Sequence, residues 1–209
     1  MSPLLIALLG VLLVPLFAGT WRASLVGLAA QGLLMAWIAY RLDWQPSSPG
    51  YWVELFDLAV IRGVGIPLVF YRVLREQRVP ARNDAIPPNL LSWTLALACV
   101  LVSFSFAGRV IEAEEDSRTL VAVACAGLML GFLTLATQAD RFSQMTAAMR
   151  IENAIALFEL GSGGHDEALP VRLGQIAVLL ATVALFRRYL RTSAPAERSE
   201  STGAEAPTL

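Results

Sequence analysis

Long apolar stretches separated by short polar segments follow one another along the chain as far as a polar C-terminal tail. A helix that crosses a bilayer needs about 20 mainly apolar residues, and most of these stretches approach that length. The pattern therefore predicts an all-α fold, a polytopic membrane helix bundle of about seven transmembrane helices. The expected spans lie near residues 3–18, 24–40, 53–71, 90–108, 119–137, 144–161 and 168–189.

The composition agrees with a protein whose main partner is the lipid bilayer. Of 209 residues, 56% are hydrophobic and 16% are charged, whereas soluble domains carry about 25% charged residues. The net charge is −1. This value argues against nucleic acid as a partner, because proteins that bind nucleic acid present a basic patch.

The arginines indicate the orientation of the spans, because positively charged loops stay on the cytoplasmic side. An N-terminus outside the membrane leaves only Arg41, Arg109 and Arg118 on the outer side, next to an acidic loop at 112–116. Ten arginines then lie on the inner side. They are Arg22, Arg72, Arg75, Arg78, Arg82, Arg141, Arg187, Arg188, Arg191 and Arg198. We therefore expect a multi-pass protein with its N-terminus outside and its C-terminus in the cytoplasm.

The spans divide the chain into three expected regions. They are an N-terminal four-helix membrane region at 1–110, a three-helix region at 111–190 and a disordered cytoplasmic tail at 191–209. The tail is rich in Ser, Ala, Pro and Glu, which is typical of disorder. The first span lacks a positively charged start and a clear cleavage site, so we expect a membrane helix there and not a signal peptide. The arginines and prolines at 72–89 indicate either a docking segment or an ordinary cytoplasmic loop.

The side chains that usually hold cofactors are scarce. Cys99 and Cys125 lie far apart inside apolar segments, where a cysteine usually acts as a small buried hydrophobe. His165 is the only histidine, and its glycine-rich loop lacks the Lys-Ser/Thr of a phosphate-binding loop. We therefore expect no cofactor and no metal in this chain, and no enzyme activity by the chain itself.

Charged residues remain inside the third span. Glu54 is close to its outer end, Asp57 lies one turn deeper, and Arg62 lies near the middle. Gly63, Gly65 and Pro67 follow and are expected to loosen or kink the helix. An arginine at this depth needs a partner, and two interpretations stay open. Arg62 and Asp57 either form an ion pair that fixes helix packing or belong to an ion pathway.

The sixth span carries a second set of charges. Glu152 and Glu159 are seven residues apart, so they share one helix face at a separation of about 10 Å. Arg150 projects almost opposite to Glu152, which argues against a salt bridge between them. With polar groups on two sides, this helix should be enclosed by protein or internal water. An amphipathic helix on the membrane surface is the alternative, although its acidic face would be repelled by anionic lipids.

The depths of these groups predict their partners. The sixth helix runs outward and the seventh runs inward, so Glu159 and Arg172 should lie at similar depth and form an ion pair. Glu152 lies near the middle of the bilayer and has no obvious partner in this hairpin. A carboxyl group in such a place can take up and release protons, so Glu152 is the first candidate for proton transfer.

Residues 149–160, MRIENAIALFEL, resemble the glutamate–asparagine helix of the hydrogenase-4 component E family. The opening hairpin, from 14–17 through 31–34, and the run at 86–91 are similar to that family as well. The resemblance implies a non-catalytic membrane subunit of formate hydrogenlyase-like and other energy-converting hydrogenase complexes, in the bacterial cytoplasmic (inner) membrane. Its partners would be antiporter-like membrane subunits and the other subunits of a complex I-like assembly.

In this family, the region that corresponds to 111–190 is similar to the small K subunit of respiratory complex I. It is also similar to the C subunit of Mrp-type sodium/proton antiporters. The resemblance implies that Glu152, with Asn153 beside it, belongs to a polar axis that conducts protons. The complex I protein usually has a second buried glutamate on the next helix, where this chain has Arg172 and Gln175. Together, the residues and the resemblance give a candidate proton or ion pathway. Its members are Glu152, Asn153, Glu159, Arg172, Arg150, Arg62 and Asp57.

Three interpretations of the function remain at this point. The first is a proton-conducting subunit of a hydrogenase-related, complex I-like complex. The second is a subunit of a redox-independent ion antiporter or ion-coupled uptake complex. The third is a purely structural assembly subunit, in which the buried charges only specify helix contacts. Replacement of Glu152 by glutamine separates the third from the others, because transport should survive only there.

Overall fold

The computed structural model describes residues 2–17, 20–42, 48–77, 90–110, 115–138, 140–162 and 169–203, and every regular element in this part of the chain is a helix. The helices are α1 (Ser2–Phe17), α2 (Trp21–Leu42), α3 (Pro49–Phe56), η1 (Asp57–Gly65), α4 (Ile66–Gln77), α5 (Leu90–Val110), α6 (Glu115–Thr137), α7 (Arg141–Gly161) and α8 (Leu169–Gly203). The predicted all-α class is confirmed. Because α3, η1 and α4 follow one another without a break, they form the helix expected as the third span.

Among the described residues, four helices are long and apolar enough to cross a membrane: Trp21–Leu42, Leu90–Val110, Glu115–Thr137 and Leu169–Thr192. A shorter apolar helix covers Pro3–Leu13. The chain therefore has the helices of a membrane protein, and a full set of seven spans stays a prediction. The helix expected as the sixth span is α7, and its charged residues make it more polar than these four apolar stretches.

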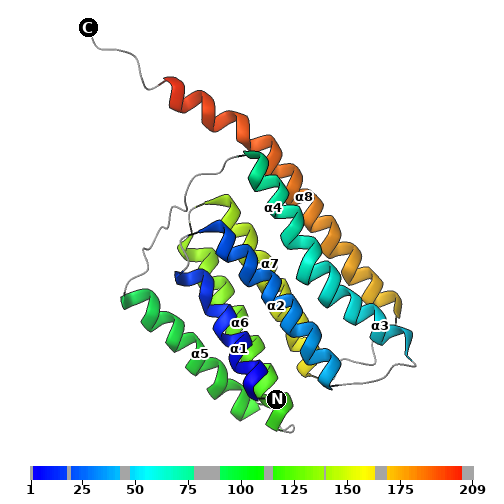
Figure 1. Ribbon diagram of the computed structural model, residues 1–209. Helices are drawn as coiled ribbons and strands as arrows, with labels where there is room; N and C mark the ends of the chain where they lie inside the picture. Colours follow the sequence, from blue (N-terminus) through cyan, green and yellow to red (C-terminus); the bar gives the residue numbers. More distant parts are fainter. Residues whose placement is uncertain are drawn as a thin grey trace.

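The helices form an elongated bundle with α5 at one edge and the pair α4 and α8 at the other (Figure 1). Between these edges α6 packs on α1, α5 and α7, while α2 packs on α1, α7 and η1. The last helix, α8, lies mainly along α3 and α4. Helices from the two predicted membrane regions, 1–110 and 111–190, therefore pack against each other throughout the bundle.

Small residues let α6 and α7 approach closely. A β-carbon added at Gly127 would lie 3.1 Å from Cβ of Ala154, and one added at Gly131 would lie 2.6 Å from Cγ1 of Ile151. We call the contact made by these four residues the dry interface, because none of them carries a polar side chain. The start of α7 is fixed separately by Asp140, whose carboxylate accepts a 2.8 Å hydrogen bond from the backbone N–H of Ser143.

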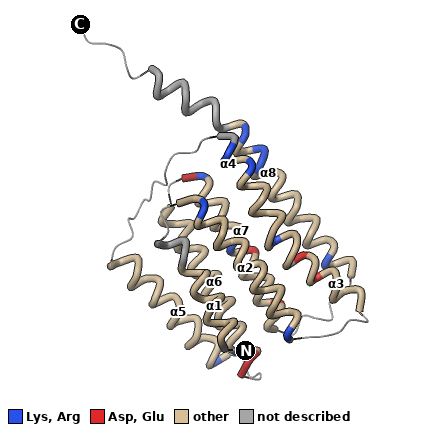
Figure 2. The backbone as a smooth tube through the Cα atoms, viewed as in Figure 1, with Lys and Arg blue, Asp and Glu red and all other residues tan. Residues whose placement is uncertain are grey.

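Several arginines gather at one end of the bundle, where the positively charged segments of α4 and α8 adjoin, and others lie along the bundle and at its other end (Figure 2). Arg72 and Arg75 are exposed on α4, and Arg187 and Arg188 are exposed on α8. The acidic first turn of α6, with Glu115 and Asp116, lies at the opposite end. This is the distribution from which the sequence predicted the orientation.

The C-terminal segment differs from the expectation. The sequence predicted disorder from residue 191, whereas α8 continues as a helix to Gly203. Alanine, glutamate and arginine favour helix, and extending a formed helix costs less than starting one. The arginines and prolines at 78–89, the acidic residues at 111–114, His165 in its glycine-rich loop and the last residues, 204–209, lie outside the described residues.

Candidate functional site

The third span changes its helix type where its charges lie. Asp57–Gly65 is a π-helix set between α3 and α4. Each backbone N–H in a π-helix bonds to the carbonyl five residues earlier, so residues five apart lie one above the other. Asp57 and Arg62 are five apart and form an ion pair, with Nε of Arg62 2.8 Å from Oδ2 of Asp57. The sequence predicted a distortion at Gly63 and Gly65, and a π-helix is the form it takes.

Arg62 joins this helix to α7. Its Nη1 donates a 3.1 Å hydrogen bond to Oδ1 of Asn153 on α7. All three side chains are buried, with Asp57 8% exposed, Arg62 6% and Asn153 2%. The prediction that Arg62 needs a partner at this depth is confirmed, and it has two. A close contact between α2 and η1 supports the arrangement, since a β-carbon on Gly32 would lie 2.6 Å from the backbone nitrogen of Gly63.

A second group of polar contacts lies nearer the ends of α3, α7 and α8. Arg172 on α8 forms an ion pair with Glu54, which is half-buried on α3. Gln175, one turn later on α8, donates a 3.4 Å hydrogen bond to Oε1 of Glu159 on α7. The sequence did not assign Glu54 as the partner of Arg172. The expected pair between Glu159 and Arg172 stays a prediction, and both residues line the same cavity.

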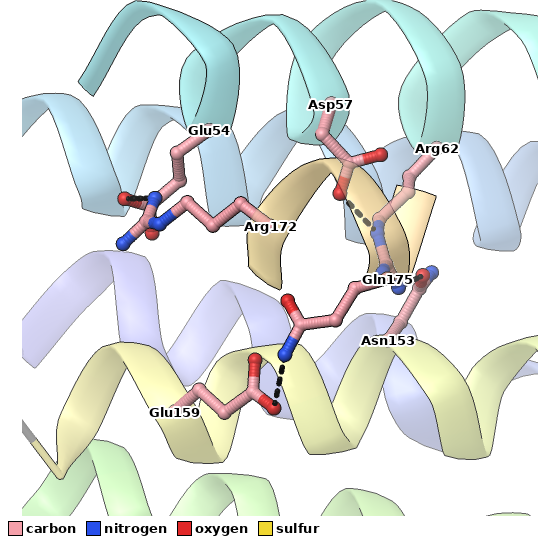
Figure 3. A network of polar contacts seen from close by, with 7 residues as sticks. All are labelled: Glu54, Asp57, Arg62, Asn153, Glu159, Arg172 and Gln175. Atoms are coloured by element: carbon pink, nitrogen blue, oxygen red, sulfur yellow. Dashed lines mark hydrogen bonds and ion pairs between the residues drawn. The ribbon is translucent and has the colours of Figure 1, made fainter. Parts of the chain in front are cut away.

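Figure 3 shows these contacts as a series of three separate polar groups on α3, η1, α7 and α8: Glu54 with Arg172, Asp57 with Arg62 and Asn153, and Glu159 with Gln175. We call this series the polar row. Its members are Glu54, Asp57, Arg62, Asn153, Glu159, Arg172 and Gln175. A cavity of about 40 Å³ lies along it, lined by six of the seven, all except Asn153. One water molecule needs at least roughly 10–15 Å³, so the cavity has room for ordered water between the charged groups.

Glu152 lies beside the polar row and outside its hydrogen bonds. It is half-buried and lines a groove of about 260 Å³ together with Arg62, Glu159 and Gln175. Among the described residues, it forms neither a hydrogen bond nor an ion pair. Glu152 also lies about 16 Å along the axis from the start of α7 and about 14 Å from its end, as expected from 1.5 Å per residue. Glu152 therefore lies near the middle of α7, and its depth in a membrane stays a prediction.

Arg150 faces the other way, as the helical geometry predicted. It is 2% exposed, and its Nη2 donates a 3.2 Å hydrogen bond to the backbone carbonyl of Ser24 on α2. Its Nη1 donates a 3.4 Å hydrogen bond to the carbonyl of Val11 on α1. Gly27 makes room for this guanidinium, because a β-carbon there would lie 2.6 Å from Nη2. Arg150 therefore ties α7 to α1 and α2, on a side of α7 away from Glu152.

Several buried polar residues were not singled out by the sequence analysis, and Gln31 is the most enclosed of them. Gln31 on α2 is fully buried, and neither its amide nitrogen nor its amide oxygen has a hydrogen-bond partner among the described residues. It lies one helical turn after Gly27, on the same face of α2 as the contact with Arg150. In the sequence, the feature that could have identified Gln31 is that it is a single amide side chain inside an apolar span, between two glycines.

The described part of the chain contains no group of three or more His, Cys, Asp or Glu residues placed to hold a metal ion. Cys99 and Cys125 are free, half-buried thiols on α5 and α6. The polar contacts described above are made by carboxylates, guanidinium groups and amides.

Comparison with known proteins adds no relative: no family model, no curated protein and no solved structure matches the chain.

Proposed function

We propose that this chain is a non-catalytic membrane subunit of a complex I-like, hydrogenase-related complex, and that Glu152 contributes to a proton or cation path between antiporter-like subunits. The observation that carries the proposal is the polar row together with the cavity and the groove beside it, because its charged residues line both spaces and Glu152 lines the groove. Charged residues inside spans are costly, at roughly 2.5–3.5 kcal/mol each, and usually mark ion paths. The resemblance of 149–160 to the component E family supplies the kind of complex.

The proposed role of Arg62 follows from the two carboxylates near it. Asp57 binds it directly, and Glu152 lines the same groove. Ionised Glu152 attracts the guanidinium toward the groove, whereas protonated Glu152 leaves it with Asp57 and Asn153. A proton that arrives at Glu152 therefore changes the field along the row, and Glu159 and Gln175 offer the next polar groups toward the end of α7.

The proposed location is the bacterial cytoplasmic (inner) membrane, with the N-terminus outside and the C-terminus in the cytoplasm. The exposed arginines at the adjoining ends of α4 and α8 support this orientation, because cytoplasmic ends carry most of the positive charge. Redox chemistry, where the complex has it, belongs in this proposal to other subunits.

Replacement of Glu152 tests the transport role. In membrane vesicles that contain the whole complex, Glu152→Gln should lower proton uptake driven by an imposed potential by at least roughly tenfold, because a proton-transfer group typically contributes 10²–10⁴-fold. The matched control is Glu115→Gln, the same change at an exposed position in the first turn of α6. Repeating the assay with sodium as the driven ion separates a proton path from a sodium path.

The structural role is the second candidate, and one observation favours it: Arg62 is already fully engaged by Asp57 and Asn153. Under that alternative, Glu152→Gln leaves transport unchanged.

The identity of the complex needs a separate measurement. A tagged version of the chain, gently extracted from native membranes, should bring down antiporter-like subunits together with a module that contains nickel and iron. Antiporter-like subunits without these metals would favour the redox-independent ion transporter. Recovery of the chain alone would contradict the proposed partners.

A further inference from the structure

The last helix, α8, is the least enclosed of the four apolar spans. Only 17% of its membrane-length stretch is buried, compared with 56% for α6. Leu179, Val183 and Leu190 are buried in contacts toward α4 and α7. Many of the other apolar side chains of α8 are exposed, among them Val178, Leu180 and Leu185, so one long side of this helix is open.

A groove runs between α8 and α7 on this open side. Its rim is apolar, with Ile155 on α7 42% exposed and Val178 on α8 67% exposed. Its lining carries Glu152, Glu159 and Arg62. Since Arg62 is neutralised by Asp57, the groove has an excess of negative charge.

Lipid acyl chains are a poor occupant for this groove. An ionised carboxylate that faces hydrocarbon near the middle of a bilayer is energetically costly. In the proposed topology Glu152 lies near that depth; it lines the groove and has neither an ion pair nor a hydrogen bond within the described chain. A positively charged group from outside the chain would remove the cost, because burial strengthens the attraction between opposite charges.

We infer that the groove between α7 and α8 receives a transmembrane helix of another subunit, and that this helix places a lysine or arginine against Glu152. Apolar side chains one turn away on the partner helix then pack on Ile155 and Val178. The inference deepens the proposed function, on which it rests for the placement of the chain in a multi-subunit complex. It goes further by naming the face that binds the partner and the chemistry of the contact.

Cross-linking in native membranes tests the occupant. A photo-activated benzophenone amino acid is introduced in place of Val178 in the full chain, and the cross-linked peptide is sequenced by mass spectrometry. The control position is Leu97 on α5, which is 60% exposed at the opposite edge of the bundle. The expected result is a transmembrane peptide that contains a lysine or arginine, obtained from position 178 and not from position 97.

Four outcomes would overturn the inference: adducts only with phospholipid, adducts with a second copy of this chain, a partner peptide without a basic residue, or the same peptide from both positions.

A charge exchange then tests the contact itself. Glu152→Arg should cause loss of the partner from the purified complex, and replacing the identified basic residue of the partner by glutamate should restore it. Failure of the exchange to restore assembly contradicts the ion pair.

These results are independent of the transport assay. If Glu152→Gln conducts protons normally while the charge exchange restores assembly, the proposed transport role fails and the docking face stands. If transport needs Glu152 but position 178 meets only lipid, the docking face fails and the transport role stands.

Discussion

The two sides of α7 differ in how they hold their neighbours. Toward α6, the dry interface uses Gly127 and Gly131 to bring Ala154 and Ile151 into close contact. Toward η1 and α8, α7 accepts hydrogen bonds from Arg62 and Gln175, and a cavity and a groove remain between the helices. Tight apolar packing fixes one face of α7, which leaves the other face free to carry costly charges. The comparison indicates that packing against α6 fixes the position of α7, whereas the polar contacts of α7 are made with η1 and α8.

The largest effect is expected from breaking the buried ion pair. Arg62→Met leaves Asp57 as an uncompensated buried charge, and removal of one partner of such a pair typically costs about 3–5 kcal/mol. The double variant Arg62→Met with Asp57→Leu should recover most of this loss. Thermal unfolding of the purified protein, followed by circular dichroism, measures both. A double variant as unstable as the single one would show that Arg62 stabilises through Asn153 and not through Asp57.

A smaller effect is expected where α2 meets η1. Gly32→Ala places a β-carbon against the backbone of Gly63, which cannot move without separating the two helices. Overpacking of this kind costs about 1–3 kcal/mol. Gly108→Ala on α5 is the control, because nothing lies within 4 Å of the added carbon. Equal melting temperatures for the two variants would contradict the close contact between α2 and η1.

The dry interface should tolerate the same change better. At Gly131 the added carbon meets the side chain of Ile151, which can shift at a cost of roughly 0.5–1.5 kcal/mol. Gly131→Ala should therefore lower the free energy of unfolding by about 1 kcal/mol, less than Gly32→Ala. The two variants are compared in one denaturation experiment, and the reverse order would show that the dry interface is the stiffer contact.

The smallest effect on stability is expected at Glu152. Because it makes no contact within the described chain that glutamine would lose, Glu152→Gln should change the free energy of unfolding of the isolated protein by less than about 0.5 kcal/mol. Transport should nevertheless fall in the same variant. If Glu152→Gln strongly lowered the free energy of unfolding, Glu152 would be a charge that stabilises the fold, as Asp57 is.

Much of the architecture follows from the sequence. Apolar stretches of bilayer length predict the helices, and the 100° advance per residue correctly separated Arg150 from Glu152 on α7. The need of Arg62 for a partner also follows, because no arginine at that depth can reach water easily. These are local arguments, in which the positions of the residues along one helix decide the outcome.

The partners across helices could not be predicted in the same way. Asn153 binds Arg62 and Glu54 binds Arg172 because η1, α7 and α8 pack at particular rotations. The rotation of each helix about its own axis cannot be predicted from hydropathy alone. The pairing of Asp57 with Arg62 also depends on the π-helix, since residues five apart in an α-helix do not lie one above the other. The unpaired amide of Gln31 likewise becomes visible only when its burial is known.

The two-sided character of α7 has a consequence for how such a protein can change over evolutionary time. One residue inserted before Arg150 would turn the rest of the helix by about 100°, moving Asn153 and Glu152 off their faces together. A point substitution alters one contact, whereas an insertion misaligns every contact beyond it. We therefore expect descendants of this chain to differ freely in the lengths of their loops and to inherit α7 without insertions or deletions.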